Sequence, residues 1–189
     1  GNDQYNQIIN KYFKYDEKIY ENLQKLRDQI SNLEDLKNNE NDINLLEKEI
    51  TLFHAKVSNE ILALIDMKVD FIGFHGQTIY HNPLKKISKQ IGNGKLLSQL
   101  TKKIVVYNFR QNDIKNGGEG APLAPIFHKL IVKQKKIKLP VCILNIGGIA
   151  NITLINEFNK DNFFSRDIGP GNCLIDEWVR KNTKDKFDN

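Results

Sequence analysis

The stretch VVYNFRQNDIKNGGEGAPLAPIFH, residues 105–128, combines a strand, a charged pair, a glycine loop and a helix start. The overlapping run KIVVYNF is β-branched and aromatic and predicts a buried strand. Arg110 and Asp113 follow it, a glycine turn occupies 117–120, and PIFHKLIVKQ has helical period. Ligands of α/β sheets bind at strand carboxyl ends, which makes Asp113 a candidate functional carboxylate. An ordinary strand-to-helix connection with a surface Asp would give the same local pattern.

Composition sets outer bounds on the fold and the compartment. The 189 residues are 40% hydrophobic, enough for one domain or for one domain and part of another. We find no bilayer-length apolar run and no charged-then-apolar leader, and we expect a cytoplasmic protein without membrane contact. Cys142 and Cys173 sit in segments that read as buried or half-buried, which favours reduced thiols. Four scattered histidines and no Cys-x-x-Cys argue against a zinc site.

The charge is unevenly distributed along the chain. Residues 1–50 carry a net charge of −4, and the remainder carries +9. Positive charge on the part with the glycine loops suits an anionic ligand such as a nucleotide or an acidic sugar. The basic residues lack interleaved aromatic residues, so a nucleic-acid partner is not expected.

The first third of the chain has helical periodicity. Residues 4–36 place apolar side chains at helical spacing, and NNEN at 38–41 breaks the pattern. A second helix is predicted over about 42–67, with Asp42 as its N-cap. Packing against a sheet is favoured over a coiled coil because the heptad pattern is irregular.

A second strand with polar groups at its end is predicted at residues 69–74. His75, Gly76, Gln77 and Thr78 follow directly; Gly76 lets the backbone approach a ligand, and Gln77 and Thr78 offer donors and acceptors to hydroxyl-rich molecules. A structural role for His75 alone is the more common case. Residues 79–94 read as a loop-rich excursion, and KLLSQL as a short helix.

Two further glycine loops lie beyond a lysine-rich hinge at 133–138. VCILNIGGIANITLIN predicts strand, turn and strand, with Gly147 and Gly148 as an anion cradle flanked by Asn145 and Asn151. A plain β-hairpin is the alternative. FFSRDIGPGN then ends a strand in a glycine loop, and the helix CLIDEWVRKNT begins there, so its N-terminus is expected to face a ligand.

The ordered set HGQT, NFRQND with GGEGAPLAP, NIGGIANIT and DIGPGN resembles the anhydro-N-acetylmuramic acid kinases, a family of the sugar-kinase/actin-like superfamily. The likeness runs from about Leu46 to Asp188. It implies an α/β fold with ribonuclease H-like lobes: a helical N-terminal region at 1–45, the remainder of a sugar-binding lobe at 46–138 and the start of a truncated nucleotide-binding lobe at 139–189. A homodimer is one option.

The resemblance also implies an activity: ATP-dependent hydrolytic ring opening and 6-phosphorylation of 1,6-anhydro-N-acetylmuramic acid in peptidoglycan recycling, with Mg²⁺. Asp113 matches the catalytic carboxylate that activates water, and Arg110 would orient it or contact the sugar. The remaining roles fall into three groups: sugar binding by His75, Gly76, Gln77, Thr78, Gly169 and Asn172; nucleotide binding by Asn145, Gly147, Gly148 and Asn151; and metal binding by Asp167.

The sequence departs from the family pattern at several places. No Gly-Thr-Ser-x-Asp-Gly hairpin precedes Leu46, and Asn108, Glu119 and Ile168 stand where Asp, Gln and Thr are usual. We therefore expect a segment of a kinase that has no appreciable turnover alone. An inactive remnant, or a sugar-binding module without ATP use, is the alternative.

Overall fold

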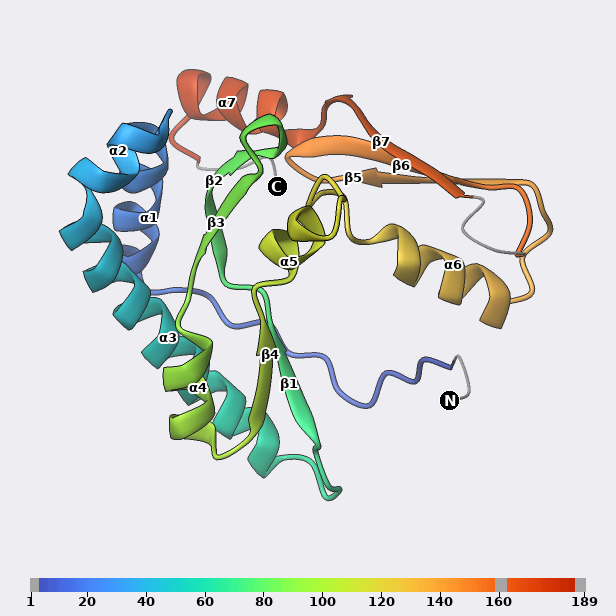
Figure 1. Ribbon diagram of the computed structural model, residues 1–189, viewed down its shortest axis with the longest axis horizontal. Helices are drawn as coiled ribbons and strands as arrows, with labels where there is room; N and C mark the ends of the chain where they lie inside the picture. Colours follow the sequence, from blue (N-terminus) through green and yellow to red (C-terminus); the bar gives the residue numbers. More distant parts are fainter. Residues whose placement is uncertain (1–3, 159–162, 186–189) are drawn as a thin grey trace. The chain divides into compact units, whose positions relative to one another are not determined.

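The computed structural model describes residues 4–158 and 163–185. The chain divides into two compact units: an N-terminal unit, Lys11–Ala121, and a C-terminal unit, Pro122–Asn189 together with Gly1–Asn10 (Figure 1). The lobe boundaries after residues 45 and 138 stay predictions. The outer ends of the predicted regions, residues 1–3 and 186–189, and residues 159–162 lie outside the described residues.

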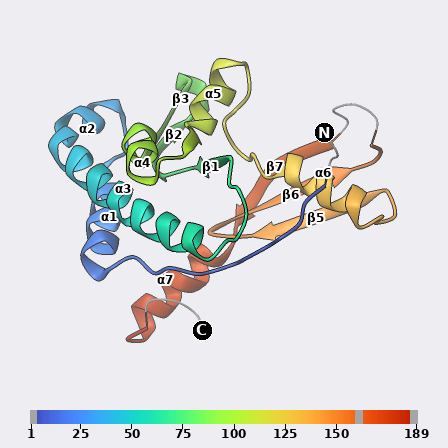
Figure 2. The same cartoon turned by 90° about the horizontal axis from the view of Figure 1, so that it is seen from below.

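Three helices open the N-terminal unit: α1 (Glu17–Gln29), α2 (Leu33–Asn38) and α3 (Glu40–Ala63). The side chain of Asp16 accepts from the Ile19 N–H and starts α1. Helices α1 and α3 lie side by side (Figures 1 and 2) and bury one apolar stripe each. Those stripes form a core with the following hairpin; its members are Ile19, Leu23, Leu26, Ile30, Ile43, Leu46, Ile50, Ile79, Tyr80 and Ile91.

The prediction that helix begins near residue 4 was wrong, because residues 4–16 contain no helix. The Asp16 cap sets the actual start. Farther upstream, the side-chain amide of Gln134 accepts from the Tyr5 N–H at 2.8 Å and donates to the Tyr5 carbonyl at 2.7 Å. This pairing engages the backbone groups of Tyr5 outside a helix. The predicted break at 38–41 is confirmed, although α3 starts after Asn39 rather than at Asp42.

Strands β1 (Phe71–Phe74) and β4 (Ile104–Tyr107) form a parallel pair, joined through helix α4 (Gly94–Thr101). Ile72, Phe74 and Val105 pack against Ala55 of α3 and Leu97 of α4. The opposite face is uncovered: Phe71 is 63% exposed and Ile104 70% exposed. The expectation of fully buried strands was therefore wrong, since helices cover one face of this pair in the described part of the chain.

A hairpin replaces the predicted loop at 79–94. Strands β2 (Gln77–Asn82) and β3 (Ile87–Ile91) pair antiparallel around the short 3₁₀ helix η1 (Pro83–Lys85). The Asn82 side chain accepts from the Lys85 N–H, and Lys86 adopts a left-handed conformation with φ of 55°. These contacts form the turn, while burial of Ile79, Tyr80 and Ile91 holds the hairpin against the helices. Turn-forming residues around Pro83 thus marked a turn within a hairpin rather than a long loop.

Helix α5 (Phe109–Lys115) completes the N-terminal unit. In the C-terminal unit, α6 (Pro125–Gln134) precedes an antiparallel sheet of β5 (Val141–Ile146), β6 (Ile149–Ile155) and β7 (Phe163–Pro170), and α7 (Asn172–Asn182) follows. Helix α6 covers one sheet face (Figure 2), where His128 Nδ1 lies 2.8 Å from Thr153 Oγ1. The predicted strand, Gly-Gly turn, strand and helix are confirmed. Cys142 and Cys173 are free but exposed, which corrects the expectation that they are buried or half-buried.

Candidate functional site

The carboxyl ends of β1 and β4 bring together His75, Arg110 and Asp113. Arg110 on α5 donates from Nε to His75 Nε2 at 2.8 Å and from Nη1 to the Gly120 carbonyl at 2.8 Å. A guanidinium can only donate, so His75 Nε2 carries the lone pair. Its Nδ1–H therefore donates to the Gly76 carbonyl at 2.9 Å. The contacts select one neutral tautomer of His75.

The glycine loop wraps around the Asp113 carboxylate. Asp113 Oδ2 accepts from the Gly120 N–H at 2.8 Å. A Cβ placed on Gly118 would lie 2.1 Å from the same oxygen, so the close approach requires glycine there. Asp113 and Arg110 both contact Gly120, and both side chains are half-buried. A carboxylate held at a strand end and partly open to solvent can act on a bound hydroxyl or water.

Gly76 is required by the packing of its own unit. Its φ is +70°, and a Cβ would lie 2.4 Å from the carbonyl oxygen of Ile91. The close approach that the structure shows at this glycine is to β3, and the approach of a ligand to Gly76 stays a prediction.

Gln77 and Thr78 are engaged inside the protein. Gln77 Oε1 accepts from Arg27 Nη2 at 3.0 Å, and Gln77 Nε2 donates to the Tyr15 hydroxyl at 3.1 Å. The Thr78 carbonyl accepts from Arg27 Nε at 3.1 Å, and the Thr78 hydroxyl accepts from Gln90 Nε2 at 3.2 Å. Sequence reasoning missed Arg27 and Tyr15, since neither stands in a local motif that could have singled it out.

His54 belongs to the same network, since its Nε2 lies 2.7 Å from the Tyr15 hydroxyl, and it should make the stability of the protein depend on pH. Burial lowers the pKa of His54, as it does that of His128. The histidines of the unfolded chain therefore bind protons more readily than those of the folded chain. The free energy of unfolding should consequently fall as pH drops below about 6.5. We expect a lower urea midpoint near pH 5 than near pH 7. His54→Gln keeps an acceptor for the Tyr15 hydroxyl and should flatten this dependence, with His128→Gln measuring the other share. An unchanged slope in both variants would contradict the prediction.

A cavity of about 620 Å³ opens beside His75 at the same strand ends. Gln90, which lines it, has a buried Oε1 with no hydrogen-bond partner among the described residues. Such an acceptor suits a ligand or water that donates a hydrogen bond. The lining residues are Leu33, Leu36, Lys37, Glu47, Phe74, His75, Ile87, Ser88, Lys89, Gln90, Gly92, Tyr107, Asn108 and Gln111.

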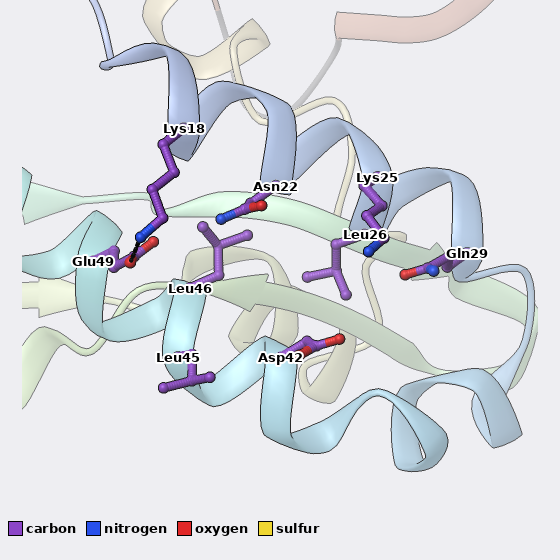
Figure 3. Close-up of a pocket in the computed structure, with 9 residues that line it drawn as sticks. All are labelled: Lys18, Asn22, Lys25, Leu26, Gln29, Asp42, Leu45, Leu46 and Glu49. Atoms are coloured by element: carbon purple, nitrogen blue, oxygen red, sulfur yellow. Dashed lines mark ion pairs between the residues drawn. The ribbon is translucent and has the colours of Figure 1, made fainter.

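A second hollow, of about 410 Å³, lies between α1 and α3 (Figure 3). Leu26 and Leu46 contribute its apolar lining, and an ion pair between Lys18 and Glu49 crosses it at 3.6 Å. The predicted site residues all lie in described parts of the chain, and none lines this groove.

In the C-terminal unit, the Gly147–Gly148 turn contacts the start of α7. The N–H groups of Gly171 and Cys173 donate to the Gly148 carbonyl at 2.9 and 3.3 Å, and that of Asn172 donates to the Gly147 carbonyl at 2.7 Å. The amides that begin α7 are therefore satisfied by the turn, which corrects the expectation that they face a ligand. A side chain at Gly148 would meet no described atom within 4 Å, which leaves that side of the turn accessible.

Three predicted polar residues form a row across the sheet. Asn145 pairs with Asn151, and Asn151 with Asp167, so all three share one face at adjacent positions. Asn151 Oδ1 is buried and lacks a partner among the described residues, whereas Asp167 is exposed. Gly169 pairs with Ala150 one step along. Within residues 4–158 and 163–185, no three His, Cys, Asp or Glu side chains gather as a metal site.

These features define an α/β protein with a carboxylate in a glycine loop and a separate glycine turn beside polar strand residues. The model of the family "Anhydro-N-acetylmuramic acid kinase" matches residues 6–189, and the chain belongs to that family. A relative of that name from Pelagibacter ubique (strain HTCC1062) is 60% identical over 188 residues, which is all of this chain and 50% of the relative. One from Methylobacterium nodulans is 42% identical over 138 residues, which is 71% of this chain and 36% of the relative.

The chain thus spans about half the length, or less, of the curated relatives it matches. Among the described residues, no helix has both the length and the apolar character needed to cross a bilayer.

Proposed function

We propose that this chain carries the sugar-site and phosphate-site residues of an ATP-dependent sugar kinase. The reaction is hydrolytic opening of 1,6-anhydro-N-acetylmuramic acid with phosphorylation of O6, giving N-acetylmuramic acid 6-phosphate during peptidoglycan recycling. Family membership supports this proposal. The observation that carries it is the Asp113 carboxylate, held by the Gly120 N–H and enclosed by Gly118 next to Arg110 and His75.

In this proposal Asp113 is the general base for the water that attacks the anomeric carbon. Arg110 holds both His75 and the Gly120 carbonyl, and so orients the loop that fixes Asp113. The sugar hydroxyls would then contact the His75–Thr78 segment, mainly through His75 and the backbone, because the side chains of Gln77 and Thr78 already have partners in the protein. Gly169 and Asn172 are proposed as further sugar contacts.

The phosphate-site proposal rests on the C-terminal unit. The open side of Gly148 leaves room for a phosphate group. The unpartnered Asn151 Oδ1 can accept a hydrogen bond from a nucleotide hydroxyl or from bound water. Gly147, Gly148, Asn145 and Asn151 would hold ATP, and the exposed Asp167 would hold Mg²⁺ with the phosphates as its other ligands. Bound Mg-ATP supplies the phosphoryl group that the sugar receives.

The finer expectations form part of the same proposal. They are a cytoplasmic enzyme, a phosphotransferase with an alcohol acceptor, a small-molecule sugar as partner and a homodimer. No observation favours the alternative of a sugar-binding module without ATP use.

Calorimetric titration of the chain with 1,6-anhydro-N-acetylmuramic acid, and separately with Mg-ATP, tests the proposal. Asp113→Asn should weaken sugar binding by about tenfold or more, because the amide can no longer accept a charge-assisted hydrogen bond from the water held between residue 113 and the anomeric carbon of the bound sugar. Asp70→Asn is the matched control: this carboxylate is exposed, paired with Lys68 at 3.1 Å, and should leave binding unchanged. Equal binding by the native chain and Asp113→Asn would refute the placement of Asp113 beside the bound sugar and its water, and absence of sugar binding by the native chain would refute the sugar site.

A further inference from the structure

A polar network links the helical N-terminal region to the HGQT segment. Arg27 on α1 donates from Nη2 to Gln77 Oε1 at 3.0 Å and from Nε to the Thr78 carbonyl at 3.1 Å. One guanidinium therefore holds both a side chain and a backbone carbonyl at the start of β2. The planar fork of Arg matches two acceptors at once, which a Lys ammonium cannot do with the same geometry.

Tyr15 holds the other end of the Gln77 amide. Gln77 Nε2 donates to the Tyr15 hydroxyl at 3.1 Å, and His54 Nε2 lies 2.7 Å from the same hydroxyl. Because the amide can only donate here, the hydroxyl proton is free to point at His54. The Tyr15 ring is fixed in turn by Phe53, with ring centroids 4.6 Å apart. Both ends of the Gln77 amide thus have partners fixed by helix packing.

The held residues adjoin the candidate site. Gln77 is the first residue of β2, and only Gly76 separates it from His75, which accepts from Arg110. The β1–β4 pairing fixes the chain before His75, and Arg27 with Tyr15 fixes it after Gly76. The turn between them then has little freedom, and His75 is placed where Arg110 Nε can reach it.

We infer that Arg27 and Tyr15 are positioning residues of the sugar site, acting through Gln77 and Thr78 on the His75–Gly76 turn. This gives the helical N-terminal region a role in the site. The inference rests on the proposed function for its effect on sugar binding, but its geometric part can be measured without any ligand.

The test compares Arg27→Met, Arg27→Lys and Tyr15→Phe by nuclear magnetic resonance of the ¹⁵N- and ¹³C-labelled chain. Arg27→Met keeps the aliphatic stem of the side chain and removes both donors. The matched control is Lys25→Met, which removes the same charge from the same helix at an exposed position in the α1–α3 groove (Figure 3). Circular dichroism establishes that each variant is folded, and calorimetry then measures sugar binding.

We expect Arg27→Met to shift the resonances of the Gln77 side-chain amide and the His75 ring, and to weaken sugar binding about tenfold. Arg27→Lys should recover part of that loss, Tyr15→Phe should shift chiefly the Gln77 amide, and Lys25→Met should change neither. A folded Arg27→Met variant with native His75 and Gln77 resonances overturns the inference. If the native chain binds no sugar, the proposed function fails, while the resonance shifts still decide whether Arg27 positions the turn. Should Arg27→Met fail to fold, Tyr15→Phe decides the question by the same resonances.

Discussion

Gly118→Ala is expected to weaken sugar binding by more than about tenfold while lowering the free energy of unfolding by only about 1 kcal/mol. The added Cβ would lie 2.1 Å from Asp113 Oδ2, which is the far end of a flexible side chain and can rotate away. Rotation relieves the overlap but breaks the bond from the Gly120 N–H to the carboxylate. The variant should therefore still fold, but it should lose the hydrogen bond that holds the Asp113 carboxylate in the site. Calorimetry with the sugar and urea unfolding measure the two effects.

Gly73→Ala is the control for this variant. A Cβ at Gly73 would lie 3.9 Å from the Phe109 ring, an ordinary contact, and should leave sugar binding unchanged. A ligand-free measurement adds a second criterion, because the amide resonance of Gly120 should shift in Gly118→Ala and stay in place in Gly73→Ala. If the Gly120 amide and the binding constant are both native in Gly118→Ala, the glycine loop does not hold Asp113 in the way described.

Gly76→Ala is expected to destabilise the N-terminal unit by about 3 kcal/mol or more. Two effects add at this position. Alanine at a φ of +70° is strained, and its Cβ would lie 2.4 Å from the Ile91 carbonyl oxygen. Ile91 is fully buried, so its backbone cannot move aside without disturbing the core. Urea unfolding followed by circular dichroism should show a clearly lower midpoint.

Gly117→Ala separates the two effects at Gly76. Gly117 also has a positive φ, of +94°, but a Cβ there meets no described atom within 4 Å. Replacement by alanine should therefore lower the free energy of unfolding only by the strain of a positive φ, about 1–2 kcal/mol. If Gly76→Ala were no more destabilising than Gly117→Ala, the overlap with Ile91 would be relieved by a shift that the structure does not indicate.

The sequence predicted those helices, strands and turns whose formation depends on residues close together in the chain. The Gly147–Gly148 turn, the strands around it and α6 follow from turn chemistry and from the period of apolar residues. The strand end before Arg110 was likewise predictable, and it led to the Asp113 carboxylate. The one-sided burial of β1 and β4 could not be predicted, because an apolar run does not reveal whether one or both faces of a strand will be covered.

Contacts distant in sequence account for most of the remaining errors. Residues 4–16 have an apolar spacing typical of a helix, yet Tyr5 pairs with Gln134, 129 positions away. The hairpin at 77–91 is stabilised by burial against helices that precede it. Arg27 and Tyr15 reach Gln77 across 50 and 62 residues. No window of sequence contains both partners of such contacts, so the polar network behind HGQT had to come from the structure.

The three hydrogen bonds between the Gly147–Gly148 carbonyls and the start of α7 have a consequence for the energetics of ligand binding. A glycine turn that was free in solution would lose conformational entropy when it closed on a ligand, and affinity would fall accordingly. Here the helix holds the turn by its carbonyls in advance, while the open side of Gly148 still faces outward. The turn is preorganised, so the phosphate group proposed to bind there would meet a backbone that is already ordered.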